Sequence, residues 1–209
     1  MDSLHKLEEI FAHFPGIGPR QAKRFVHYIQ GKSSGSIKEL VELIGEVRRS
    51  TNECNLCHRF FTKTVVADKT CPICSDPSRD QTTLMIVARD SDFETVEKSG
   101  AYKGLYFILG GTVPILDKEP EKKIRLRELL GRISPTKEKV TNNVVTFAFN
   151  EIILSLNTTP DGEHTAEIIK DALQKFSTKT TVLGRGLSTG AELEYADGET
   201  IRNALKSRL

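Results

Sequence analysis

The amino-acid sequence predicts an α/β protein of several modules, and three observations support this prediction. In the first quarter of its 209 residues, apolar side chains recur at helical spacing. All four cysteines then fall in one short stretch, from Cys54 to Cys74. Beyond them, short apolar runs alternate with helical patterns, as they do in a parallel sheet with helices on both faces. With 38% hydrophobic residues, a chain of this length can bury a real core.

Three helices are predicted in the N-terminal region, residues 1–52. Apolar residues recur at helical spacing over Ser3–His13, and again between Ile37 and Val47. Between these segments, Gln21–Gln30 places its apolar residues on one face and its basic residues elsewhere. Amphipathic helices bury one face against a neighbour, so we expect an all-helical module here.

The stretch FPGIGPRQAKRF, Phe14–Phe25, joins the first two of these helices. Two glycines and two prolines in close succession predict a tight hairpin that delivers Pro19 into the first turn of the next helix. Such a hairpin exposes backbone N–H groups around Gly16 and Gly18, beside the positive end of the helix dipole, where a phosphate oxygen binds well. From Pro15 to Lys32 the chain has four Lys or Arg residues and no Asp or Glu.

This hairpin has two interpretations. It resembles the helix-hairpin-helix motif of many DNA-binding proteins, which grips phosphates without reading bases. The alternative is a corner between helices that only packs and has a solvated basic face. The formal net charge of +2 is too small for a bulk polycation, so contact with nucleic acid has to come from local basic clusters. The cluster beside the hairpin favours a DNA-binding region that ignores base sequence.

The cysteines form two CxxC pairs, which predict a zinc-finger module over residues 53–80. The candidate metal ligands are Cys54, Cys57, Cys71 and Cys74. Two such pairs at this separation can place four thiolates in a tetrahedron around one Zn²⁺ ion. Because four cysteines leave no position for water, we expect a structural zinc ion, one per chain, with His58 as a bystander. A redox CxxC pair and four small buried hydrophobic side chains are the weaker alternatives.

Four short apolar runs after the cysteines predict buried strands. They are Thr83–Ala88, Leu105–Gly110, Glu151–Leu156 and Thr180–Gly184. The helical patterns between them are Phe93–Lys98, Glu121–Ile133 and Glu163–Phe176. Strand and helix thus alternate, which predicts a parallel sheet. The segment Ser134–Asn143 is expected to be a surface loop.

The sequence predicts neither a membrane protein nor a secreted one. No apolar run approaches the roughly 20 residues of a membrane span. The first residues, Met1–His5, lack the basic and then apolar pattern of a signal peptide. Clustered cysteines are typical of metal sites in a reducing compartment. We therefore expect a cytoplasmic protein.

Four sequence motifs occur in a recognisable order. They are PGIGPRQAKR in the hairpin, CPICSDPSRD at the second cysteine pair, NTTPDGEHTA at Asn157–Ala166 and GRGLSTGAELEYADGETIRNAL at Gly184–Leu205. Together they resemble the RecR family of bacterial recombination mediator proteins, of which this chain looks like a divergent member. The resemblance covers nearly the whole chain. It implies a Toprim domain over residues 81–180, the fold shared with topoisomerases and primases, and a C-terminal segment, residues 181–209, that packs on it.

The resemblance also implies a function and partners. Proteins of this family take part in recombinational DNA repair and assemble, from dimers up to tetramers, into rings that can encircle DNA. They help to load recombinase onto single-stranded or gapped DNA together with the partner proteins RecO and RecF, which implies association with the nucleoid. The resemblance places basic DNA contacts at Arg20 and Arg24, with Lys23 beside them.

Departures from the family pattern argue against catalysis. Active Toprim enzymes use clustered carboxylates to hold Mg²⁺ for phosphoryl transfer. The family usually has a glutamate at the position of Ala88, although Asp90 and Asp92 follow closely. Asp161 and Glu163 are present too, but a carboxylate pair at a helix start is also an ordinary cap or a contact for a partner. We expect no enzymatic activity; the alternatives are a Toprim-type nuclease or topoisomerase and a zinc-ribbon interaction protein.

Overall fold

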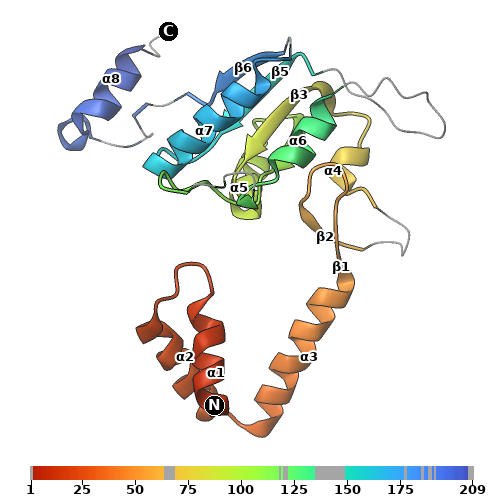
Figure 1. Cartoon of the computed structure of the whole chain (residues 1–209), viewed down its shortest axis with the longest axis vertical. Helices are drawn as coiled ribbons and strands as arrows, with labels where there is room; N and C mark the ends of the chain where they lie inside the picture. Colours follow the sequence, from red (N-terminus) through yellow and green to blue (C-terminus); the bar gives the residue numbers. More distant parts are fainter. Residues whose placement is uncertain are drawn as a thin grey trace. The chain divides into compact units, whose positions relative to one another are not determined.

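The computed structural model describes residues 2–63, 69–117, 119, 122–134, 149–176, 178–184, 186–187, 190 and 192–206 of the chain. They belong to two compact units, Met1–Thr51 and Asn52–Leu209 (Figure 1). Most of the loop predicted at Ser134–Asn143 lies outside the described residues. In the described part of the chain, no helix is long and apolar enough to cross a membrane.

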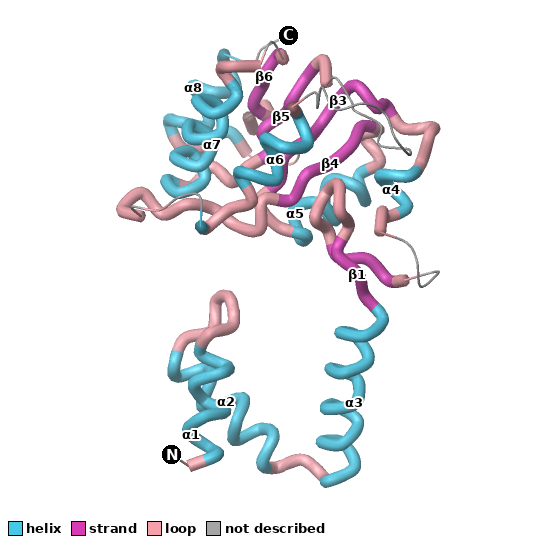
Figure 2. Tube along the Cα trace, turned by 45° about the vertical axis from the view of Figure 1, so that its right-hand side comes forward, coloured by secondary structure: helices cyan, strands magenta, loops and turns pink. Residues whose placement is uncertain are grey.

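The first unit consists of three helices. They are α1 (Ser3–Ala12), α2 (Pro19–Gln30) and α3 (Ser34–Ser50). The side chains of Asp2 and Ser33 cap α1 and α3 by accepting hydrogen bonds from backbone N–H groups in the first turn of each helix. Proline fits at the start of α2, because its φ is already helical and it needs no N–H partner there. The prediction of an all-helical N-terminal region is confirmed, and Figure 2 shows α1 and α2 packed as a pair.

Few side chains are buried in this first unit. Among its described residues, only Ala22 and Val26 on α2 are buried. Phe11 makes edge-to-face contacts with Phe14 and Phe25, with ring centroids 5.4 and 5.8 Å apart. These aromatic contacts take the place of a larger core, and they leave apolar surface exposed.

The cysteine module comes next in the chain. Strands β1 (Thr51–Glu53) and β2 (Phe60–Thr62) form a two-stranded sheet, and the short helix α4 (Pro72–Ser75) follows. The buried cluster of the module consists of the four cysteines and Phe61. So small an apolar core is typical of modules that depend on a metal ion for their fold.

A parallel sheet of four strands forms the centre of the second unit. The strands are β3 (Asp80–Val87), β4 (Gly104–Ile108), β5 (Glu151–Ser155) and β6 (Lys179–Val182). Their order is β4-β3-β5-β6, so β4 and β6 are the edge strands. Val87 lies in register with Ile108 of β4 on one side and with Ser155 of β5 on the other. The predicted parallel sheet is confirmed, with each strand at the position of one apolar run.

Helices cover both faces of this sheet (Figure 2). They are α5 (Asp90–Ser99), α6 (Leu126–Ile133) and α7 (Pro160–Leu173). On one face Phe93 of α5 packs with Met85 and Val87. On the other face Leu84 and Ile86 belong to the larger apolar cluster, which includes residues of α6 and α7. This alternation along β3 follows from side chains that point to opposite faces of a strand.

Helix α6 begins later than the sequence pattern predicts. The expected start was Glu121, but the helix starts at Leu126. The preceding Ile124 is buried in the large apolar cluster, and the Arg125 N–H donates to the Leu109 carbonyl oxygen at 2.9 Å. Tertiary contacts of this connection with the sheet therefore override its helical pattern.

The C-terminal segment ends in α8 (Gly198–Lys206), after a 3₁₀ turn at Leu193–Tyr195. The Asp197 carboxylate accepts hydrogen bonds from the N–H groups of Glu199 and Thr200, which satisfies the first turn of the helix. All described side chains from Leu193 onward are exposed or half-buried. The expected packing of this segment on the sheet domain stays a prediction.

Candidate metal centre and nucleic-acid interface

The four cysteine sulfur atoms converge on one point. The Sγ atoms of Cys54, Cys57, Cys71 and Cys74 all lie within 4.8 Å of one another. Those of Cys57 and Cys71 are 3.6 Å apart. This spacing is close to the roughly 3.8 Å between neighbouring sulfurs of a tetrahedron with Zn–S bonds of about 2.3 Å. All four cysteines are buried, so the structure brings together the ligands that the sequence predicts, in a site closed to solvent.

Each CxxC pair is held in a tight turn. In the first pair, the His58 N–H donates to the Cys54 carbonyl oxygen, and the Cys54 N–H donates to the Arg59 carbonyl oxygen, both at 2.9 Å. His58 has a φ of 60°, in the left-handed region that non-glycine residues seldom occupy. In the second pair, the Cys71 N–H donates to Cys54 Sγ at 3.3 Å. The turns thus aim backbone donors and sulfur atoms at the same point.

The four buried thiols shift one another's pKa values through hydrogen bonds between their sulfur atoms. Hydrogen bonds, the largest with Cys57, lower the pKa of the Cys54 thiol. For Cys71, the hydrogen bond with Cys54 raises the pKa, but those with Cys57 and Cys74 bring it down to about 7. Hydrogen bonds led by the one with Cys54 raise the pKa values of Cys57 and Cys74. A bound metal ion would stabilise all four cysteines as thiolates.

The cysteine module is joined to β4, the edge strand of the sheet. The Ile108 N–H donates to the Cys57 carbonyl oxygen at 2.9 Å. From α6, Arg132 Nη1 donates to the carbonyl oxygens of Leu56 and Tyr106, at 2.7 and 2.6 Å. The sequence interpretation missed Arg132, since nothing in the local pattern of α6 distinguishes it from the other arginines there.

The hairpin between α1 and α2 has the backbone that the sequence predicts. Gly16 has a φ of 75°, a conformation that would strain any residue with a side chain. Gly18 is the N-cap of α2, whose first turn contains no acidic residue. The basic residues predicted to contact DNA are Arg20, Lys23 and Arg24, and all three are exposed. Glycine backbone and basic side chains therefore occur together at one helix N-terminus; their contact with DNA stays a prediction.

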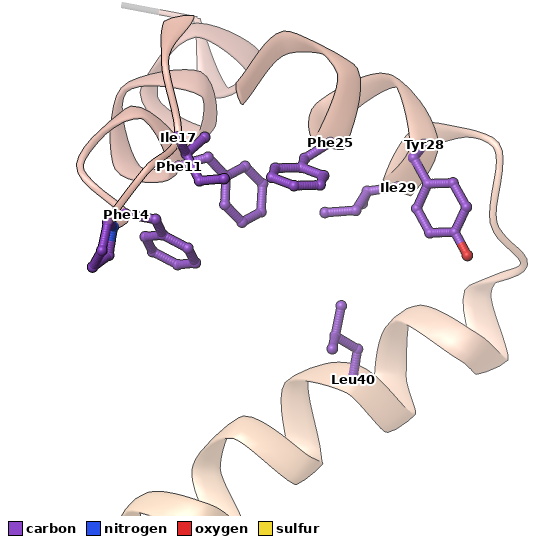
Figure 3. A pocket seen from close by; sticks show the side chains of 8 residues that line it. Phe11, Phe14, Ile17, Phe25, Tyr28, Ile29 and Leu40 are labelled. Carbon is purple, nitrogen blue, oxygen red and sulfur yellow. The ribbon is translucent and has the colours of Figure 1, made fainter. Parts of the chain in front are cut away.

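An apolar pocket lies beside the hairpin, within the first unit (Figure 3). Its volume is about 580 Å³, and it is lined by Phe11, Phe14, Pro15, Ile17, Phe25, Tyr28, Ile29 and Leu40. Figure 3 shows side chains of α2 and Leu40 of α3 directed into the same space. The Tyr28 side chain remains 64% exposed. An open apolar pocket of this kind is typical of an interaction surface.

In the described part of the chain, the carboxylates that an active Toprim enzyme would use do not form a group of three or more metal ligands. Ala88, directly after β3, is buried. Asp90, Asp92 and Asp161 each accept a hydrogen bond from a backbone N–H. Asp161 and Glu163 lie in the first turn of α7, where carboxylates favour the helix dipole, and Thr159 supplies the cap. Among the described residues, the four cysteines are the only group arranged to hold a metal ion.

Comparisons with known proteins match nearly the whole chain. Residues 82–184 match the Toprim domain, and residues 186–208 match the C-terminal region of RecR. The recombination protein RecR of Chloroflexus aggregans is 35% identical over 203 residues, which cover 97% of this chain and 91% of that protein. The recombination protein RecR of Lactobacillus helveticus is 31% identical, with 97% and 94% coverage. That of Paracoccus denitrificans is 32% identical, with 99% and 96% coverage.

Proposed function

Because the chain belongs to the RecR family, we propose that it is a DNA-binding recombination mediator that acts without catalysis. It takes part in recombinational DNA repair and helps to load recombinase onto single-stranded or gapped DNA. RecO-like and RecF-like proteins are its partners in this step. Its own contribution is to hold DNA through sequence-independent contacts with phosphates.

The hairpin at the start of α2 is the observation on which this proposal rests. Backbone N–H groups around Gly16 and Gly18 take a phosphate oxygen at the positive end of the helix dipole. Arg20 and Arg24 are four residues apart and so lie on neighbouring turns of one face of α2, where they neutralise adjacent phosphates. No carboxylate in the first turn of the helix opposes this charge.

The metal of the four-cysteine site is proposed to be zinc, with a structural role. Four thiolates around one Zn²⁺ ion fill its tetrahedral coordination and leave no position for a reacting water. The ion would be held by Cys54, Cys57, Cys71 and Cys74. When bound, it would crosslink the two CxxC turns. The metal module therefore serves the architecture of the second unit and not a chemical step.

The absence of catalysis is proposed from the positions of the acidic residues. Phosphoryl-transfer enzymes need carboxylates that converge on Mg²⁺. In this chain the residue after β3 is Ala88, and Asp90 and Asp161 accept hydrogen bonds from the backbone of neighbouring segments. The acids that could have formed the cluster are thus used to hold the fold together.

The proposal is tested by removing the charge of the hairpin. In the variant Arg20→Ala with Arg24→Ala, we expect DNA affinity to fall by about tenfold or more, because two phosphate contacts are lost. The slope of log affinity against log salt should become less steep by about 2. Fluorescence anisotropy with labelled DNA of unrelated sequences, measured across a salt series, reports both quantities.

A matched control removes the same number of positive charges at positions away from the hairpin. Lys38→Ala with Arg48→Ala removes two positive charges from exposed positions of α3, in the same unit. This control should bind DNA like the wild type, and metal content should be the same in all three proteins. Wild-type affinity of the hairpin variant at every salt concentration would show that the hairpin only packs, and the proposal would fail.

A further inference from the structure

The side chain of Arg132 connects three parts of the second unit. Its Nη1 atom donates to the Leu56 carbonyl oxygen in the first CxxC turn and to the Tyr106 carbonyl oxygen in β4. Its Nη2 atom lies 3.9 Å from Cys74 Sγ, in the second CxxC turn. One guanidinium group on α6 thus contacts both cysteine turns and the edge of the sheet.

The charge of this guanidinium has no carboxylate partner among the described residues. No Asp or Glu side chain of the described chain lies within ion-pair distance of it, whereas Arg79 and Arg125 both pair with glutamates. The Nε atom of Arg132 is buried and has no hydrogen-bond partner among the residues that the structure describes. The Arg132 side chain is half-buried, and its guanidinium carbon lies 5.8 Å from the centroid of the Phe149 ring. A negative charge nearby would stabilise this cation further.

A tetrathiolate metal site supplies that charge. One divalent ion and four thiolates carry a net charge of −2, and Cys74 is one of the four ligands. A cation that donates a hydrogen bond to a ligating sulfur offsets this negative charge and fixes the position of the sulfur. The two carbonyl contacts of Arg132 hold the guanidinium where it can do so.

We propose that Arg132 is a positioning residue for the metal site, which holds the four-cysteine module on β4 and slows release of the metal. This inference rests on the metal site proposed above, and goes beyond it by assigning a role to a residue that is not a ligand. Arginine suits the role because its planar fork serves several acceptors at fixed angles. A lysine at this position could supply the charge but not the bridge.

The experiment compares metal release from the whole protein in Arg132→Ala, Arg132→Lys and wild type. Zinc-loaded protein is mixed with a chromophoric chelator, and the rate of zinc transfer is measured. Loss of an outer-shell partner typically costs 10–100-fold in metal affinity, so we expect release from Arg132→Ala to be at least about tenfold faster. Arg132→Lys should release zinc at an intermediate rate.

A cobalt-substituted sample separates positioning of the sulfur from general loosening of the fold. Without the cation near Cys74, the sulfur donates more strongly, so the thiolate-to-cobalt absorption band should move to longer wavelength in Arg132→Ala. Arg127→Ala is the matched control, since Arg127 is an exposed arginine of the same helix. The control should match the wild type in release rate and in spectrum.

The outcomes are distinct. Equal release rates and equal cobalt spectra for wild type and Arg132→Ala would overturn the inference about Arg132. A wild type that binds neither zinc nor cobalt would instead overturn the metal site itself, and with it the inference. If Arg132→Ala does not fold, the comparison of Arg132→Lys with wild type decides, and equal rates again overturn the inference.

Discussion

At the scale of single residues, Ala88 occupies a position at which an active Toprim enzyme would carry a carboxylate. It follows β3, at the carboxyl end of a parallel strand, where α/β proteins usually place their reactive groups. Its side chain is a buried methyl group, and its carbonyl oxygen accepts a hydrogen bond from the Gly110 N–H at 3.0 Å. The position therefore contributes backbone structure and no carboxylate. Phosphoryl-transfer enzymes of the Toprim type use a carboxylate at this strand end, and this chain has a methyl group there.

Cys57 is the residue at which the metal prediction can be tested most directly. It is fully buried, and its sulfur lies 3.6 Å from that of Cys71. In Cys57→Ser we expect zinc content to fall from about one ion per chain to near zero, because three thiolates do not close the site. Stability should fall by more than about 3 kcal/mol, since loss of a structural metal is among the largest single-residue effects.

Elemental analysis and thermal unfolding measure the two effects of this substitution. Serine replaces the sulfur by a hydroxyl of similar shape, so cavity formation contributes little to the result. A Cys57→Ser protein that keeps its zinc and its melting temperature would contradict the proposed coordination.

At the scale of elements, the contacts at the edge of β4 show how the cysteine module is held on the sheet. An edge strand presents unpaired backbone groups that can recruit another chain. Here three arginines and one cysteine turn occupy these groups: Arg79 bonds to Gly104, Arg132 to Tyr106, and Arg125 and Cys57 to Ile108. The Cys57 turn of the module and the three arginines thus cover this edge together, and a metal ion that orders the module would also help to protect the sheet.

Metal removal should expose this edge. After treatment with a chelator, we expect the protein to form assemblies that grow with time and bind an amyloid-type dye, because β4 can then pair with other strands. Light scattering and dye fluorescence follow the process. Addition of zinc before the chelator is the control, and should prevent it. Chelated protein that loses its metal but keeps the size of the untreated protein would show that the module is not an edge cover.

The strands could be predicted from the sequence, and the start of α6 could not. The runs of β3 and β4 are apolar because the sheet buries both of its faces there, so the pattern is local, whereas no residue of the edge strand β6 is buried. The segment before α6 has a helical pattern too, but burial of Ile124 and the bond between Arg125 and Leu109 decide its conformation. Those contacts join this segment to residues that are distant in the sequence, so the local pattern does not reveal them.

In the candidate sites, too, some residues could be predicted from the sequence and one could not. The cysteine ligands could be predicted because each CxxC spacing is itself a local geometry. The Gly16 turn could be predicted because glycine is needed where φ is positive. Arg132 could not, since it contacts Leu56 across 76 positions of the chain and Cys74 across 58. Contacts between residues so far apart in the chain produce no local sequence motif.

At the scale of the whole molecule, exposed apolar surface on the first unit indicates assembly. Leu40, Ile44 and Val47 follow one another at helical spacing on α3, and Ile44 is 63% exposed. No residue of α3 is buried. An apolar stripe of this kind on a folded unit usually contacts another chain. A closed ring of identical chains would bury the stripe and place several hairpins around one hole.

We expect assembly and DNA binding to fail together when this stripe is disrupted. In Ile44→Asp with Val47→Asp, we expect the multimer of the wild type at micromolar concentration to fall to smaller species, because two carboxylates enter the contact. DNA affinity should drop by at least about tenfold although the hairpin is intact, since a single hairpin would bind weakly and a ring would link several of them. Light scattering gives the mass, and fluorescence anisotropy gives the affinity.

Lys38→Asp changes the charge by the same amount at an exposed polar position of α3, so this control should keep both properties. A wild type that is monomeric with and without DNA would argue against the ring, whereas a dissociated variant that binds DNA as tightly as the wild type would show that assembly and DNA binding are independent.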